Sequence, residues 1–206
     1  MRTALVTTLT GVALLSAGAW MRIDTPLTVQ PESRVWVEGT STTKSWSCKA
    51  PEFDADIIAT SADAAAAVAC GEKAVRSVTI KVASQKLDCG NGTMTGHAKK
   101  AIKADEHKTI TFTLVGYDLA KSADGVRGTL KGTLNLGGVA RPVAIAATAK
   151  PAAGGQMRVS GIYPLKMSDY GLKAPSLMMG AMKVKDDVTV GFDLLLKAAP
   201  PAAPIP

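Results

Sequence analysis

Three cysteines, two histidines and a group of methionines are the residues of this chain whose chemistry could define a site. Cys48, Cys70 and Cys89 are widely spaced and have no histidine beside them, which disfavours a metal site. In an oxidising compartment, three cysteines predict one disulfide and one remaining thiol. We expect Cys48 to pair with Cys89, since each borders a segment that must be held in place. Pairing of Cys48 with Cys70 is the alternative.

The two histidines do not predict a catalytic group. His97 falls near the apolar face of a predicted helix, where a structural role is expected, and His107 lies in a polar segment typical of a surface loop. The sequence contains no G-x-S-x-G nucleophile elbow, phosphate-binding glycine loop or H-E-x-x-H motif. We therefore predict no catalytic residues, no cofactor and no metal site. An enzyme that uses Cys70 or His97 is the least favoured hypothesis.

Methionines surround a turn near the C-terminal end of the chain. Met167, Met178 and Met179 lie on either side of the Asp169-Tyr170 pair. Methionine is unbranched and polarizable, so it can adapt to a flexible apolar chain. These five residues are candidate ligand contacts, with Asp169 placed to position a polar head group. The alternative is that the methionines are ordinary core and that Asp169 caps the turn.

Alternation of apolar and polar residues predicts about eight strands, because it places apolar side chains on one face of each strand. Short turns with glycine separate these segments and indicate an antiparallel meander. Such strands form a sandwich or a barrel, and glycines inside the strands favour the bends of a closed barrel. A barrel of about eight strands has room for one small ligand. The segments are 35–38, 53–58, 78–82, 110–114, 130–136, 143–147, 157–159 and 188–194.

One short helix is predicted to interrupt the strands. Asn91 is a suitable N-cap, and Met94, Ala98 and Ala101 recur at helical spacing after it. The alanine-rich segment 62–69 is either a second weak helix or a loop.

Both ends of the chain are expected to lie outside the barrel domain, which we place at residues 33–197. Residues 1–19 are predicted to be a signal peptide, with a basic start, an uncharged run and small residues at Ala17-Gly18-Ala19. An uncleaved membrane anchor is the alternative. Residues 20–32 are expected to lead into the barrel, and residues 198–206, alanine and proline with one isoleucine, to form a disordered tail. The protein is therefore expected to be periplasmic or secreted.

The charge of the chain limits its partners. Its formal net charge is +7, and the basic residues are scattered along the sequence. Aromatic residues make up only 4% of the chain, which disfavours nucleic-acid binding by base stacking. We expect either a peripheral contact with anionic lipid head groups at a membrane surface or simply a solvated surface.

Four pieces of the sequence, in order, resemble the YceI-like family: Val35–Ser41 with Ser45-Trp46, Leu87–Asn91 with His97, Gly132–Leu134 with Gly138–Val143, and Met167–Pro175 with Val188–Leu196. The resemblance implies an eight-stranded antiparallel, lipocalin-like barrel whose cavity takes an isoprenoid or similar lipid. It also implies export to the periplasm and no catalytic apparatus. Members often dimerise, so a homodimer is expected on the resemblance alone.

The phase of the strands places a set of side chains inside such a barrel. They are Phe112, Leu114, Val159, Tyr163 and Phe192, each of which is either a ligand contact or ordinary core. We therefore expect an exported all-β binding protein that holds an apolar lipid in its barrel. The alternative is a structural or protein-interaction module of the cell envelope, with a filled barrel and no ligand.

Overall fold

The computed structural model describes residues 24–123, 125–177 and 182–199. The predicted signal peptide, the first residues of the lead-in and residues 200–206 of the tail lie outside the described residues, so these expectations stay predictions. Within the described ranges, no helix has the length and apolar content needed to cross a bilayer.

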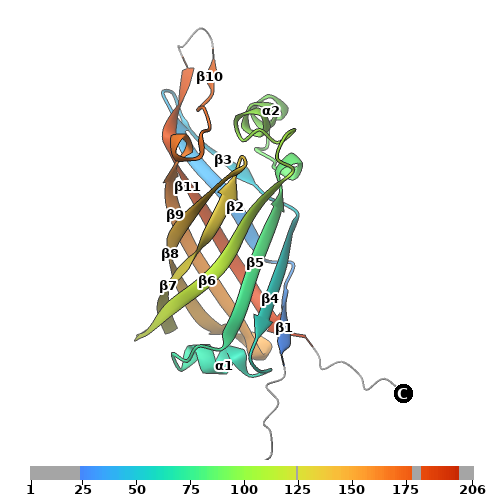
Figure 1. Cartoon of the computed structure of the whole chain (residues 1–206), viewed down its shortest axis with the longest axis vertical. Coiled ribbons are helices and arrows are strands. Elements are labelled where there is room, and N and C mark those ends of the chain that lie inside the picture. The colour runs from blue at the N-terminus through green and yellow to red at the C-terminus, as the bar shows by residue number, and fades with distance from the viewer. Residues whose placement is uncertain (1–23, 124, 178–181, 200–206) are drawn as a thin grey trace, which may run out of the picture.

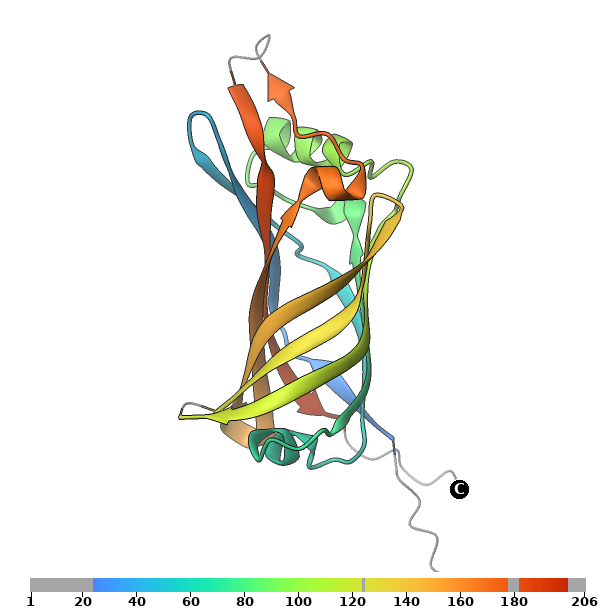
Figure 2. The same cartoon turned by 60° about the vertical axis from the view of Figure 1, so that its left-hand side comes forward.

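Eight antiparallel strands close a barrel (Figures 1 and 2). Their order around the barrel is β1, β4, β5, β6, β7, β8, β9 and β11, and β11 pairs with β1 to complete the circle. The predicted all-β barrel is confirmed. The closing strands are β1 (Thr25–Val29), β4 (Phe53–Ala59), β5 (Val75–Ala83), β6 (Thr109–Ser122), β7 (Gly125–Leu136), β8 (Val139–Ala152), β9 (Gln156–Lys166) and β11 (Met182–Ala198).

Further strands extend the sheet at one end of the barrel. β2 (Arg34–Ser41) pairs with β11 beyond the reach of β1, and β3 (Ser45–Lys49) pairs with β2. The two-residue β10 (Ser176–Leu177) pairs with the start of β11. All eight alternating segments are strands, but β1, β3 and β10 were not predicted. β1 lies in the expected lead-in, and β11 includes Ala198, the first residue of the expected tail.

The described residues form two α-helices, the predicted one and a second in the segment where the sequence allows either a weak helix or a loop. In α2 (Gly92–Ala101), the Asn91 side chain accepts a hydrogen bond of 3.1 Å from the Met94 backbone N–H, which confirms the predicted N-cap. The alanine-rich segment forms α1 (Ala64–Ala69). Short 3₁₀ turns occur at Ser84–Lys86, Ala153–Gly155 and Met167–Tyr170. The two helices lie at opposite ends of the barrel (Figure 1).

An extra residue in β6 changes which side chains face inward. The register with β7 shifts between Leu114 and Gly116, so Val115 is a bulge and is 79% exposed. Leu114 before the bulge and Tyr117 after it both face the interior. Even-numbered residues of β6 therefore face the interior before the bulge, and odd-numbered residues face it after the bulge.

The end of the barrel that carries α1 is closed by a hydrophobic cluster. Ala64 and Val68 of α1 are buried against Leu27 of β1, Met157 of β9 and Leu196 of β11. Among the described residues, α1 and this cluster therefore cover the barrel interior at this end.

Candidate functional site

A cavity of about 590 Å³ follows the interior of the barrel. Its lining extends from Val68 in α1 to His97 in α2. On β6 alone the lining residues run from Ile110 to Leu119, which is roughly 30 Å of strand at about 3.3 Å per residue. The size lies within the usual range for small-molecule sites. The barrel is therefore not filled by its own side chains.

Small residues form part of the cavity wall. Ala147 on β8 has Gly128 of β7 and Gly161 of β9 as its Cα partners. Across these three strands, the methyl group of Ala147 is the one side chain in the row. The ring of Phe192 lies over Gly161, where an added Cβ would stand 2.8 Å from the ring. The small side chain of Ala147 thus leaves space inside the cavity, while the ring of Phe192 covers the neighbouring Gly161.

Six of the ten predicted ligand contacts line the cavity. These residues, from three strands and the 3₁₀ turn after β9, are Phe112, Leu114, Val159, Tyr163, Met167 and Phe192. The strand phase was sufficient to place five of them, since alternate side chains of a strand share one face. Their role as ligand contacts stays a prediction.

The other four candidates do not form part of the described cavity wall. Asp169 is exposed, and its backbone carbonyl accepts a hydrogen bond from the Arg141 guanidinium. Tyr170 is buried in a cluster with Leu136 and Leu165, beside the cavity. Asp169 and Tyr170 belong to a 3₁₀ turn, so the alternation of side chains along a strand does not predict which way they point. Met178 and Met179 lie outside the described residues.

The position of Tyr170 leads to a testable expectation. Burial raises the pKa of Tyr170 to about 12. The folded state therefore holds this proton where the unfolded chain loses it, so stability falls as the pH rises from about 10 through about 12. We expect Tyr170→Phe to remove the latest step of an alkaline titration followed by phenolate absorbance. Uptake of a prenyl alcohol should stay unchanged, and its loss in this variant would make Tyr170 a ligand contact after all.

The cavity reaches solvent at the α2 end. Among the described residues that line it, the exposed ones are Lys44, Asn91 and Thr93. Lys44 lies in the turn between β2 and β3, and the other two are at the start of α2. Ser41 and His97 add further polar atoms to the same end. We call these five residues the mouth of the cavity.

The mouth was not predicted as a site because its residues come from two distant segments. Lys44 and Asn91 are brought together by tertiary structure alone. The one available signal was the inner face of the predicted helix, where His97 accompanies Met94 and Ala98; all three line the cavity. No residue of α2 is fully buried, since the inner face of the helix borders open space.

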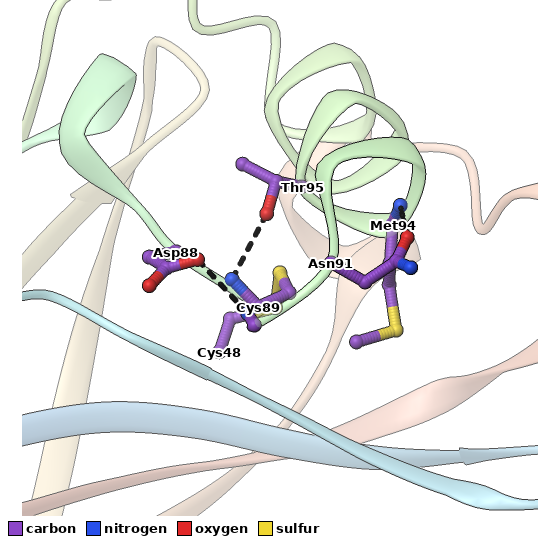
Figure 3. Close-up of a disulfide and its surroundings, with 7 residues drawn as sticks. Cys48, Asp88, Cys89, Asn91, Met94 and Thr95 are labelled. Carbon is purple, nitrogen blue, oxygen red and sulfur yellow. Dashed lines mark hydrogen bonds between the residues drawn. A yellow bond between two sulfur atoms is a disulfide. The ribbon is translucent and has the colours of Figure 1, made fainter.

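A disulfide fastens this end of the molecule, as Figure 3 shows. Cys48 of β3 is bonded to Cys89, which lies three residues before α2, and both are buried. This confirms the predicted pairing and leaves Cys70 as an exposed free thiol. Lys49 and Asp88 beside the disulfide exchange two backbone hydrogen bonds, of 2.7 and 2.9 Å. The approach to α2 is thus held to β3 by a covalent bond and a β-bridge.

The interior contains few polar groups. Among the described residues, no aspartate or glutamate lines the cavity. Tyr117 faces the interior near α1, and its hydroxyl accepts a hydrogen bond from the Val75 N–H and donates one to the Val75 carbonyl. Burial raises the pKa of Tyr117 despite these bonds. In the described part of the chain no three His, Cys, Asp or Glu side chains gather as a metal site would require.

A search of protein families and solved structures found relatives of this barrel. A family model described as a YceI-like domain matches residues 29–196. A search of curated proteins found no match. BcnA of Burkholderia cenocepacia is 20% identical with a TM-score of 0.64, and the match covers 82% of this chain and 99% of that one.

Two other solved structures share the fold at low identity. One is a polyisoprenoid binding domain from Saccharophagus degradans implicated in plant cell wall breakdown. It is 13% identical with a TM-score of 0.56, and the match covers 85% of this chain and 98% of that one. The other is a YCEI protein of Campylobacter jejuni, 18% identical with a TM-score of 0.55, with coverage of 74% and 84%. At these identities the structural likeness establishes the fold.

Proposed function

Because this chain belongs to the YceI-like family, we propose that it is an exported binding protein that holds an apolar lipid of the polyisoprenoid class inside its barrel. The observation that carries the proposal is the cavity of about 590 Å³, which follows the barrel, is closed by α1 and opens beside α2. A relative of the same fold is a polyisoprenoid binding domain.

The driving force for binding is the removal of apolar ligand surface from water. Each methylene that enters the cavity contributes about 0.8 kcal/mol. The wall suits a flexible branched chain, since Met157 and Met167 can adapt their side chains and the rings of Phe112 and Phe192 offer flat contacts. The lining has no carboxylate among the described residues, so an apolar chain meets no buried negative charge.

The shape of the cavity gives the ligand a direction. The α1 end is covered by the cluster around Val68, while the polar side chains of the mouth lie at the α2 end. A polar head group keeps its hydration at the mouth, and the tail extends towards α1. The reverse orientation buries the head group where the polar side chains are Tyr117 and Thr148, whose hydroxyls are already bonded to Val75 and Ser160, so desolvation of the head group opposes it.

We propose binding rather than catalysis. The YceI-like family is generally a non-catalytic binding family. An envelope module with a filled barrel would need side chains in the space that the cavity occupies. The observations favour the lipid-binding function over that alternative.

A series of prenyl alcohols tests the proposal. Tryptophan fluorescence reports on binding as geraniol, farnesol and geranylgeraniol are titrated into the protein, because Trp36 and Trp46 both line the cavity. We expect the affinity to rise at least about tenfold with each isoprene unit until the cavity is full.

Straight-chain alcohols with the same numbers of carbon atoms are the control. Equal affinity for both series would contradict the isoprenoid class but leave an apolar lipid as the ligand. The absence of saturable binding by every member of both series would contradict the proposed function.

A further inference from the structure

We propose that the α2 end of the barrel docks on an anionic lipid bilayer, with the mouth of the cavity facing the membrane. The docking rests on the charge of this end, and only its purpose, passage of the ligand between bilayer and cavity, rests on the proposed function.

Three segments surround the mouth, and all three are basic. They are the turn at residues 41–45, α2 with its following residues to 103, and the described residues 171–177 and 182–185, which pair through β10 and β11. Ser41, Met94 and Val184, one from each segment, line the cavity. The segments contain seven lysines and no aspartate or glutamate: Lys44, Lys99, Lys100, Lys103, Lys173, Lys183 and Lys185.

Hydrogen bonds join two of these segments directly. The Thr42 N–H donates to the Lys183 carbonyl at 3.0 Å, and Val184 is the Cα partner of Ser41 in the sheet. α2 lies at the same end in both views of the molecule (Figures 1 and 2). The seven lysines therefore belong to one end of the barrel.

These lysines are available to a partner. Lys99 is half-buried and the other six are exposed. In the described part of the chain, none of the seven forms an ion pair. Of the acidic residues just outside the segments, Asp186 accepts hydrogen bonds from the Ser168 N–H and hydroxyl, and Asp105 accepts one from Gln85. Glu106 and Asp187 are exposed.

At the opposite end of the barrel, residues 60–72, which include α1, contain Asp63 and Glu72 and no lysine or arginine. The strand ends beside α1 carry the exposed Lys121, Arg127 and Lys150. The α2 end differs because its three segments hold seven lysines and no acidic residue. Lysines near an anionic bilayer each contribute about 1 kcal/mol, so seven of them suffice for peripheral binding.

The geometry favours a membrane over a nucleic acid as the anionic partner. Trp46, two residues after Lys44, lines the cavity instead of standing on the exposed surface where bases could stack. An apolar cavity opens among the lysines, which suits a surface that has an apolar interior behind its anionic head groups. The inner face of α2 adds the apolar side chains of Met94 and Ala98 to this opening.

Co-sedimentation with lipid vesicles tests the docking. The probes are vesicles of phosphatidylcholine alone and of equal parts phosphatidylcholine and phosphatidylglycerol. We expect the protein to bind the anionic vesicles and not the neutral ones, and to be released at about 1 M salt, where the Debye length is about 3 Å. Replacing Lys99, Lys100 and Lys103 by glutamine should weaken binding about 100-fold, at about fivefold per charge.

A triple variant of equal charge change serves as the control. Lys121, Arg127 and Lys150 are exposed residues near the α1 end. Their replacement by glutamine should weaken vesicle binding less than about fivefold, because these charges lie far from the membrane. Equal loss in both triple variants, equal binding to both kinds of vesicle, or tighter binding to a DNA duplex than to vesicles would overturn the proposal.

Uptake of geranylgeraniol in the absence of vesicles separates the two proposals. The α2 triple variant should retain this uptake while losing vesicle binding. A protein that binds anionic vesicles through α2 but takes up no prenyl alcohol would contradict the proposed function and leave the docking intact. A protein that takes up the alcohol but does not bind the anionic vesicles would contradict the docking alone.

Discussion

Replacement of Ala147 by tryptophan is expected to abolish uptake of prenyl lipids while the barrel stays folded. Ala147 lies in the row of small residues on the inner wall, between Gly128 and Gly161. An added side chain at Gly161 would meet the Ala146 carbonyl oxygen at 2.6 Å, and Gly128 is equally crowded, so Ala147 is the position in this row from which the cavity can be filled.

The expected effect of Ala147→Trp is large because the indole occupies the space of several methylenes of the ligand. Exclusion of three or four of them lowers the affinity by about 100-fold or more. Binding is measured by titration with geranylgeraniol, and folding by circular dichroism during heating.

The neighbouring residue provides a matched control. Ala146 is exposed on the outer face of β8, opposite Ile162. Ala146→Trp adds the same side chain to the same strand without entering the cavity, so its affinity should equal that of the unmodified protein. If Ala147→Trp also binds normally, the ligand does not occupy the middle of the barrel.

Removal of the disulfide is expected to destabilise the protein by about 4 kcal/mol. Cys48 and Cys89 are 41 residues apart, and the entropy of the unfolded chain rises by about this amount when a loop of that length is opened. For a domain of this size, the double variant Cys48→Ala with Cys89→Ala should unfold roughly 8–16 °C below the unmodified protein.

Cys70→Ser is the control for this variant. The Cys70 thiol is exposed and unpaired, so its replacement should change stability by less than about 0.5 kcal/mol. Thermal unfolding of both proteins under oxidising conditions gives the comparison. A double variant within 1 °C of the unmodified protein would show that the disulfide does not constrain the fold.

The disulfide also has a predicted effect on ligand exchange. Cys89 holds the residues before α2 to β3, and α2 covers the cavity at its open end. Without the covalent link we expect faster release of a bound prenyl alcohol from the folded protein. Dissociation into an excess of lipid vesicles measures this rate, and an unchanged rate would mean that α2 does not limit release.

Alternation in the sequence predicted most of the barrel, because a period of two residues follows directly from the geometry of a strand. It gave the interior positions of Phe112 and Phe192. It could not place residues beyond a bulge or in a 3₁₀ turn. Val115 shifts the phase of β6, and the turn after β9 directs Tyr170 into a cluster beside the cavity.

The strands that were missed are short, with at most five residues each. The first residues of β1 pair with β4 and the last three pair with β11, so long-range pairing stabilises β1 rather than local propensity. The mouth was missed for a related reason. Lys44 and His97 are distant in sequence, and only tertiary structure brings them to the same end of the cavity.

The measurement that tests the account most directly is native mass spectrometry of the mature protein isolated from the cell envelope, followed by organic extraction of whatever is bound. The account predicts one apolar molecule per chain, which extraction identifies as an isoprenoid lipid. Ala147→Trp isolated in the same way should carry none. A mass equal to that of the bare polypeptide, unchanged after incubation with prenyl lipids, would contradict the proposal that the barrel is a lipid-binding site.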